Sequence, residues 1–316
     1  MRSGWKRIGP GAAKMGIGLC AALLLLQALP ARADALKAKV PVRTASAEAP
    51  ARPLILAHRG ASAYAPENTL AAFDLAVRQG ADYIELDVQL SADGIPFVLH
   101  DENLERTTGG KGRASLRTAD ELMRLDAGAW FSPRFAGQRI PLLEDVLLRY
   151  YNRIGLLIEL KDADRQPGLV QAVAELMRRC GINGEIRLQD AVNGPPWKKE
   201  PVMIQSFHIP ALKQVHALLP SIPLGVLISE DKELTPAALH AMAEWADYAN
   251  IRKQLAKPLK VKMIHDSGLH TFIWTVDSKR QALKAAAAGA DGILTDDPEA
   301  LGSFWSQRRP KPGLKK

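Results

Sequence analysis

The stretch YIELDVQLSADGIPFVLHD, residues 83–101, opens as an apolar strand that two acids, Glu85 and Asp87, interrupt. Successive side chains of a strand point to opposite faces, so these two acids share one face with Tyr83. Two carboxylates so close together repel each other unless a cation lies between them. The stretch therefore predicts a strand that holds a cation near its end.

Short apolar runs alternate with helical patterns along most of the chain. Helical patterns follow most of these runs, at spacings typical of βα units. A right-handed series of eight such units closes into a (β/α)8 barrel. We therefore predict an α/β fold of the (β/α)8 barrel type, with a doubly wound open sheet as the alternative. The eight expected strands are residues 54–57, 83–88, 154–160, 202–207, 223–229, 248–251, 271–276 and 291–295.

Two segments interrupt this repeat. Residues 101–140 are too long and too polar for a βα loop, and we predict that they form a small inserted lobe after the second strand region. Residues 184–201 form a second long excursion. The barrel is expected to span residues 54–305, and a basic tail at residues 306–316 follows it.

The N-terminal segment differs from the rest of the chain. Residues 1–33 combine basic residues, an apolar run at residues 15–29 and the sequence Ala-Arg-Ala that ends at Ala33. This pattern is typical of a secretory signal peptide cleaved after Ala33. The run is shorter than the roughly 20 apolar residues that span a membrane, so we expect no stable membrane anchor after cleavage. Residues 34–53, rich in Ala and Pro, are interpreted as a linker, and the mature protein is expected to be periplasmic or secreted.

Charge and cysteine content exclude several classes of protein. Cleavage would remove five basic residues and no acid, which lowers the formal net charge from +8 to +3. Much of the excess positive charge therefore lies in the predicted signal peptide, and we expect no nucleic-acid partner. Cys180 is the one cysteine outside the signal peptide, so the mature chain has neither an intramolecular disulfide nor a thiolate metal site. Composition leaves the oligomeric state open.

A third acid follows the same alternation as the first two. Glu159 and Lys161 stand at the end of the next barrel strand. Active sites of such barrels lie at the carboxyl ends of the strands. The three carboxylates of Glu85, Asp87 and Glu159 suit a hard ion, Mg²⁺ or Ca²⁺, between which the sequence does not choose. A single acid at a strand end more often caps a helix or pairs with a lysine, but the three together favour a metal site.

Two histidines bracket the acids. His58 ends the first strand, and His100 ends the run FVLH. Together they can supply a general base and a general acid. Arg59 can bind an anion through paired hydrogen bonds, and Gly60 lets the backbone approach a ligand closely. With Lys161, this set favours phosphodiester cleavage, in which the cations offset charge on the phosphate and the histidines move protons.

Several longer segments carry a family resemblance. The segments HRG, PENTLAAF, GADYIELDVQLSADGIPFVLHD and ERTTGGKG resemble the glycerophosphodiester phosphodiesterase family, and LLIELK, IQSF, FIWTVD and GADGILTDDP continue the resemblance. It covers roughly residues 54–301. The motifs are specific in combination, whereas HRG alone would be weak.

The resemblance implies a barrel with an insertion after the second strand, one divalent cation as cofactor, and hydrolysis of a glycerophosphodiester to glycerol 3-phosphate and an alcohol. It leaves open which histidine is the acid and which the base. Its implied site residues are the catalytic pair His58 and His100, the metal ligands Glu85, Asp87 and Glu159, and Arg59 and Lys161 for the phosphate and glycerol.

Other positions have two interpretations each. Trp274, at the end of the seventh strand, either forms a wall of the glycerol pocket or packs in the core. Asn68 or Thr69 is expected to cap the helix that follows, and for Asn68 we prefer capping to a role in the site. The aromatic residues of the lobe either contact the alcohol part of the substrate or form the lobe's own small core; these are Trp130, Phe131 and Phe135.

Alternative functions remain. A lysophospholipase D-type phosphodiesterase would retain an acyl chain on its substrate. A lyase similar to sphingomyelinase D shares the histidines and acids, but the HRG and PENT segments and the lobe argue against it. A non-catalytic phosphodiester-binding protein ranks lower, because both histidines are present.

Overall fold

The computed structural model describes residues 52–183 and 200–307. The predicted signal peptide, residues 34–51 of the predicted linker, residues 184–199 of the second excursion and residues 308–316 of the basic tail lie outside these ranges.

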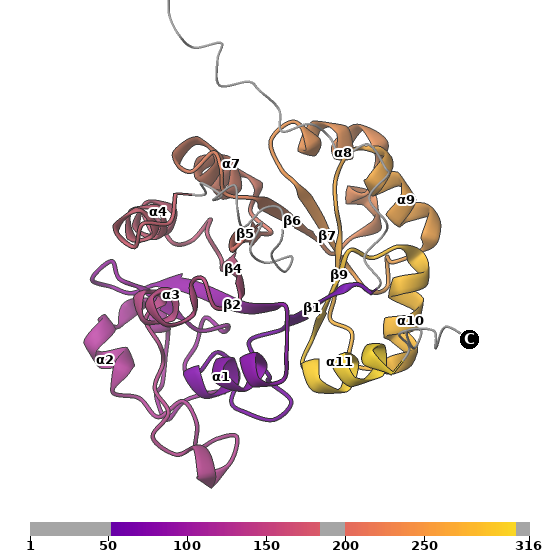
Figure 1. Cartoon of the computed structure of the whole chain (residues 1–316). Helices are drawn as coiled ribbons and strands as arrows, with labels where there is room; N and C mark the ends of the chain where they lie inside the picture. The colour runs from indigo at the N-terminus through magenta and orange to yellow at the C-terminus, as the bar shows by residue number, and fades with distance from the viewer. Residues whose placement is uncertain (1–51, 184–199, 308–316) are drawn as a thin grey trace, which may run out of the picture. The chain divides into compact units, whose positions relative to one another are not determined.

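Eight parallel strands form a closed barrel (Figure 1). The first strand pairs with both the last and the second, so the sheet has no open edge between them. This closure confirms the predicted (β/α)8 barrel over the doubly wound alternative. The strands are β1 (Leu54–Ala57), β2 (Tyr83–Leu90), β4 (Gly155–Leu160), β5 (Val202–Ser206), β6 (Leu224–Ile228), β7 (Tyr248–Arg252), β8 (Phe272–Trp274) and β9 (Gly292–Thr295).

Helices surround the barrel and cover its outer face (Figure 1). Outward side chains such as Ile84 and Leu86 on β2 pack with the apolar faces of these helices in one large buried cluster. Side chains of a strand alternate between its two faces, so β2 places Ile84 and Leu86 against the helices and Glu85 and Asp87 toward the barrel interior. The helices are α1 (Leu70–Arg78), α3 (Leu143–Tyr150), α4 (Leu169–Arg179), α7 (Ile209–Leu218), α8 (Pro236–Ala243), α9 (Pro258–Asp266), α10 (Lys279–Ala288) and α11 (Pro298–Ser306).

An apolar layer fills the barrel interior beneath the acids. Tyr83 belongs to this layer and precedes Glu85 by two residues on β2, so the acids lie nearer the carboxyl ends of the strands. Two inward-facing glycines make room for large rings: a methyl group on Gly155 would lie 2.2 Å from the Tyr83 ring, and one on Gly292 would lie 2.6 Å from Phe272. The layer consists of Leu56, Tyr83, Leu157, Met203, Tyr248, Phe272 and Leu294.

The inserted lobe, residues 101–140, follows β3 (Pro96–Val98), which runs antiparallel to β2. The lobe contains η1 (Ala114–Leu116), α2 (Ala119–Met123) and η2 (Pro133–Phe135). Its small core is formed by residues other than the three aromatic ones named from the sequence. Those three rings contact one another edge to face, and the Trp130 side chain is exposed. The core consists of Phe97, Leu99, Leu104, Ala114, Leu122, Ala127 and Ile140.

Among the described residues, no helix combines the length and the apolar character that crossing a membrane requires.

Candidate active site

The three predicted metal ligands meet at the carboxyl ends of two neighbouring strands. Asp87 on β2 and Glu159 on β4 are direct partners in the parallel register. One oxygen from each of Glu85, Asp87 and Glu159 lies within 4.8 Å of the others, and all three residues are buried. The sequence placed them on one face of their strands, and the structure brings them together.

The electrostatics of this acidic triad fit a bound cation. Burial and the charge of Asp87 raise the pKa of Glu85 to about 8. One oxygen of Glu85, Oε1, is buried with no hydrogen-bond partner among the described residues. A carboxylate left in this state is costly, because a buried charge needs a partner. Oxygen donors of this kind match Mg²⁺ or Ca²⁺, so the triad fits a hard divalent cation.

Two cationic side chains border the triad. The Nζ of Lys161 lies 2.9 Å from Glu159 Oε1 and 3.7 Å from Asp87 Oδ1. The Nε of Arg59 lies 3.4 Å from Asp87 Oδ2, and the backbone N–H of Arg59 donates to Glu85 at 2.8 Å. Burial works to raise the pKa of Asp87, but the charges of Arg59 and Lys161 outweigh it and lower that pKa to about 2. Both predicted phosphate-binding residues therefore lie beside the metal ligands.

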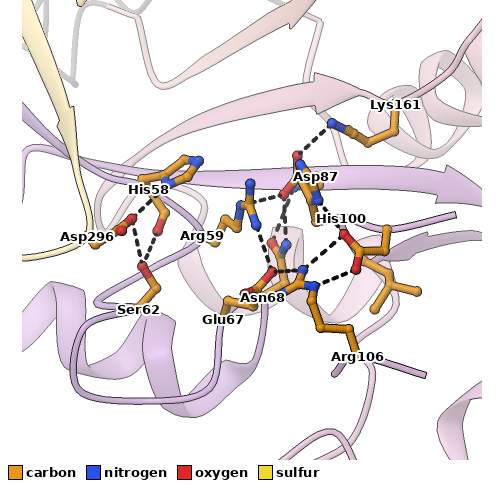
Figure 2. Close-up of polar contacts among 12 residues, drawn as sticks. His58, Arg59, Ser62, Glu67, Asn68, Asp87, His100, Arg106, Lys161 and Asp296 are labelled. Atoms are coloured by element: carbon orange, nitrogen blue, oxygen red, sulfur yellow. Dashed lines mark hydrogen bonds and ion pairs between the residues drawn. The ribbon is translucent and has the colours of Figure 1, made fainter. Parts of the chain in front are cut away.

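Asn68 holds Asp87, and Thr69 is the one of the two expected residues that caps α1. Its Nδ2 donates to Asp87 Oδ2 at 2.8 Å, and its Oδ1 accepts from the Asp87 backbone N–H at 3.3 Å (Figure 2). Thr69 caps the helix by accepting from the N–H of Ala72. Asn68 has a φ of 57°, which turns its side chain back toward β2.

His58 is held by an aspartate from the other end of the chain. Its Nδ1 lies 2.6 Å from Oδ1 of Asp296, the residue directly after β9. The Ser62 hydroxyl lies 2.8 Å from the His58 backbone O and 3.1 Å from the same Asp296 oxygen, and its proton is shared between these two acceptors (Figure 2). Burial works to lower the pKa of His58, but the hydrogen bond to Asp296 and the charge of Glu85 outweigh it, so the pKa is raised above 6.5. A carboxylate can only accept, so we assign the proton to Nδ1, which leaves Nε2 for chemistry.

His100 is also held by an aspartate, but its surroundings shift its pKa in the opposite direction to that of His58. Its Nδ1 lies 2.7 Å from Asp101 Oδ1. Burial lowers the pKa of His100 below 6.5, and the charges of Arg59 and Lys161 contribute to the decrease, against the opposing effect of Asp87. The pKa values of the two histidines are therefore shifted in opposite directions, upward for His58 and downward for His100.

A chain of ion pairs links the loop after β1 to the lobe. Arg59 Nη1 donates to Glu67 at 2.8 Å. Glu67 also accepts two hydrogen bonds from Arg106 of the lobe, and Arg106 donates two more to Asp101. Figure 2 shows this chain running from Arg59 to the neighbourhood of His100.

Sequence reasoning did not assign roles to Asp296, Asp101 or Arg106. One signal was present for Asp296, because it follows the last barrel strand directly, as His58 follows the first. The close approach of a ligand to the Gly60 backbone stays a prediction, but a methyl group at this position would lie 2.7 Å from Ala72 of α1. Close packing against α1 therefore accounts for this glycine.

Two aromatic rings stand at the carboxyl ends of β5 and β8. Trp274 packs against the interior layer and donates its indole N–H to Asn250 O at 3.0 Å. Its ring meets the half-exposed ring of Phe207 edge to face, with centroids 5.8 Å apart. Trp274 therefore packs against the core and is partly exposed, and its place in a glycerol pocket stays a prediction.

Comparisons with known proteins agree with this geometry. The model of the Glycerophosphoryl diester phosphodiesterase family matches residues 58–300. The chain is 42% identical to the YhdW protein of Bacillus subtilis, over 78% of this chain and 96% of that protein. It is 36% identical to a glycerophosphodiester phosphodiesterase of Caldanaerobacter subterraneus, over 78% of this chain and 96% of that enzyme.

A solved phosphodiesterase structure is also similar to this chain. The Oleispira antarctica phosphodiesterase in complex with its product sn-glycerol-3-phosphate is 31% identical, with a TM-score of 0.68 over 80% of this chain and 96% of that one. The family match covers most of the chain, and the acidic triad, both histidines and every barrel strand after β1 lie within the matched residues. The chain therefore belongs to the glycerophosphoryl diester phosphodiesterase family and is a phosphoric diester hydrolase.

Proposed function

We propose that the chain hydrolyses glycerophosphodiesters by acid–base catalysis between His58 and His100, with one divalent cation held by the acidic triad. The observation that carries the proposal is the pairing of each histidine Nδ1 with a carboxylate beside three buried acids. Such pairing fixes the tautomer and orientation of an imidazole, which is what proton transfer requires.

The opposite pKa shifts support an assignment of roles. His100, whose pKa is lowered, would accept the proton of the attacking hydroxyl as its oxygen bonds to phosphorus. Attack by water gives glycerol 3-phosphate directly, whereas attack by the neighbouring glycerol hydroxyl gives a cyclic phosphodiester that a water then opens. His58, whose pKa is raised, would donate its proton to the departing alcohol oxygen as the P–O bond breaks. Arg59 and Lys161 would offset charge on the phosphate oxygens. A divalent cation bound by Glu85, Asp87 and Glu159 would supply further charge stabilisation.

The test is release of glycerol 3-phosphate from glycerophosphocholine by residues 34–316, after chelation and again with Mg²⁺ or Ca²⁺ restored. We expect release to stop with chelator and to return with one of the ions. Release that is unaffected by chelation would contradict the metal requirement, and no release with either ion would contradict the substrate class.

Variants separate the proton-transfer residues from the metal ligands. We expect His58→Ala and His100→Ala to abolish turnover while calorimetry still detects metal binding. Glu85→Ala should weaken metal binding instead. Loss of metal binding in His100→Ala, together with its retention in Glu85→Ala, would contradict these roles.

A cavity favours lysophospholipids as a second substrate class. It has a volume of about 550 Å³ and lies between α1 and the lobe. Tyr64 and Ala65 of the loop that follows His58 contribute to its lining, as do the apolar side chains of Leu70, Leu75 and Phe135. Asp74, Arg78 and Arg134 also line the cavity, so a retained acyl chain would meet apolar surface bordered by charged groups.

Filling the cavity tests that second class. Ala71→Trp places a large ring at the cavity lining. We expect this variant to lose turnover of lysophosphatidylcholine and to keep turnover of glycerophosphocholine. Equal retention of both activities would exclude the cavity as an acyl-chain site.

We also propose a periplasmic or secreted location for the mature protein, on the basis of the signal-peptide pattern in residues 1–33. N-terminal sequencing of protein recovered from a secreting host should begin at Asp34. An intact N-terminus would contradict cleavage.

A further inference from the structure

The lobe residue Arg106 contacts two carboxylates that belong to different parts of the site. Its Nη1 and Nη2 donate to Glu67 Oε2 and Oε1 at 2.7 and 2.8 Å. Its Nε and Nη2 donate to Asp101 Oδ2 and Oδ1 at 2.5 and 3.0 Å. A planar guanidinium is suited to two such paired contacts at once, whereas an ammonium group is not.

Each carboxylate also holds a residue that the proposed chemistry uses. Glu67 accepts from Arg59 Nη1 at 2.8 Å, and Asp101 binds His100 Nδ1 at 2.7 Å (Figure 2). Arg106 thus lies between the phosphate-binding arginine and one of the two catalytic histidines. It contacts neither of them, so any effect it has on the reaction passes through Glu67 and Asp101.

The charges along this chain alternate. Arg59 and Arg106 are cationic, and the hydrogen bonds and charge of Arg106 help to keep the pKa of Glu67 and of Asp101 below their ordinary values. Without Arg106, Glu67 would keep one cationic partner and Asp101 would keep only His100 among the contacts described here. Both carboxylates would then be freer to turn away from the residues that they orient.

We propose that Arg106 is a positioning residue that sets both Arg59 and His100, so that the inserted lobe forms a working part of the active site. This inference rests on the proposed function, and it assigns to the lobe a part in that reaction. It predicts separate kinetic effects along the chain of contacts. Loss of the Glu67 contact should act on phosphate binding, and loss of the Asp101 contact should act on proton transfer.

A purely structural role for Arg106 would have a different signature. The Arg106 side chain is 45% exposed, and exposed ion pairs contribute little to folding stability. Arg113 offers a matched control, because it is 50% exposed, belongs to the same lobe and pairs with Glu102 rather than with the barrel loops. If the pairs only held the lobe together, the two arginines should be equally dispensable.

The experiment compares Arg106→Ala, Arg106→Lys and Arg113→Ala in steady-state turnover of glycerophosphocholine, with thermal unfolding of each. We expect kcat/KM to fall about 10- to 100-fold in Arg106→Ala, the range seen when partners that orient functional ligands are removed. Arg106→Lys should recover little of this loss, because lysine cannot make the two paired contacts. Arg113→Ala should match the wild type.

Two further variants divide the effect. Glu67→Gln should mainly raise KM, and Asp101→Asn should mainly lower kcat, whereas Arg106→Ala should do both. Adding Glu67→Gln to Arg106→Ala should cost less than the two single losses combined, because both remove one contact path.

The outcomes distinguish this inference from the proposed function. A wild-type chain that releases no glycerol 3-phosphate overturns both. An active wild type together with an Arg106→Ala variant that equals Arg113→Ala overturns the role of Arg106 alone, as does full rescue by lysine. If Arg106→Ala unfolds below the assay temperature, the same comparison is made with Arg106→Gln.

Discussion

Asn68 is not one of the three predicted metal ligands, but it holds one of them, Asp87, in place. Both ends of its amide contact Asp87, one at the side chain and one at the backbone. This is the kind of support that fixes the orientation of a metal-binding carboxylate. The left-handed φ of Asn68 costs little, since asparagine tolerates this conformation better than most residues.

Replacing Asn68 by glycine removes the amide and keeps the backbone conformation accessible. We expect divalent-cation affinity, measured by calorimetry, to fall about 10- to 100-fold. Asn152→Gly is the matched control, because Asn152 has a φ of 62° on an exposed turn far from these contacts. Equal affinities in the two variants would refute the role given to the amide.

Asp296 acts on His58 through charge as well as orientation. Its carboxylate favours the protonated imidazole, so Asp296→Asn should lower the pKa of His58. If His58 is the acid, kcat/KM falls as His58 loses its proton, and this alkaline limb should move to lower pH in the variant. We also expect kcat to decrease by about 10- to 100-fold, as for other orienting partners.

Ser62→Ala serves as the comparison, because it removes the hydroxyl that contacts Asp296 Oδ1 and the His58 backbone O and leaves the Asp296–His58 side-chain contact in place. Its alkaline limb should stay close to that of the wild type. A limb that moves to higher pH in Asp296→Asn would show that the sign of the effect, and the role of His58 as acid, are wrong.

At the scale of the strand, Gly155 lets β4 lie against the ring of Tyr83 on β2. Gly155→Ala would place a methyl group 2.2 Å from that ring, and the surrounding layer is fully packed. Overpacking of this kind destabilises by about 1–3 kcal/mol. We expect that loss in urea unfolding, and no comparable loss in Gly109→Ala, where a methyl group meets nothing within 4 Å.

The strands could be predicted from the sequence because their apolar and alternating patterns involve only neighbouring residues. The eight strands and the inward placement of Glu85 and Asp87 follow from alternation along a strand, which needs no tertiary knowledge. The partners of the site residues lie in loops, where no periodic pattern operates. Asn68 looked like a helix cap because it precedes α1, and only the position of β2 beside it decides otherwise. Arg106 binds Glu67 across 39 positions, which no local pattern predicts.

At the scale of the whole barrel, a further cluster of histidines around an aspartate lies at the amino ends of β8 and β9, opposite the active site. Asp291 accepts from the Thr271 N–H and lies 2.9 Å from His265 and 3.3 Å from His270. The hydrogen bond to Asp291 raises the pKa of His270. Burial works to raise the pKa of Asp291, but the bonds from the two histidines lower it below the ordinary range.

The sign of the pH dependence follows from these directions. The depressed Asp291 contributes stability above its unfolded pKa of 3.8, and that contribution is lost as the pH falls toward its folded pKa. The raised His270 contributes below its unfolded pKa of 6.5, and that contribution is lost as the pH rises through its folded pKa. Asp291→Asn should therefore cost more stability at about pH 6 than at pH 8.

Urea unfolding at the two pH values measures the difference, which should be modest because His270 is half exposed. Asp266→Asn, which breaks an exposed pair with Lys262 on one helix, should show no such dependence. A cost for Asp291→Asn that is the same at both pH values would contradict the charge of His270 as its source.

The seam of the barrel, where β1 pairs with β9, joins His58 to Asp296 across 238 positions of sequence. The acidic triad and His100, by contrast, come from β2, β4 and the segment between them, well before β9 in the chain. A folding chain can therefore assemble its ligands early, but His58 gains its orienting carboxylate only when the last strand docks against the first. We therefore expect turnover to report on completion of the fold, because a chain cut before β9 lacks the aspartate that holds His58.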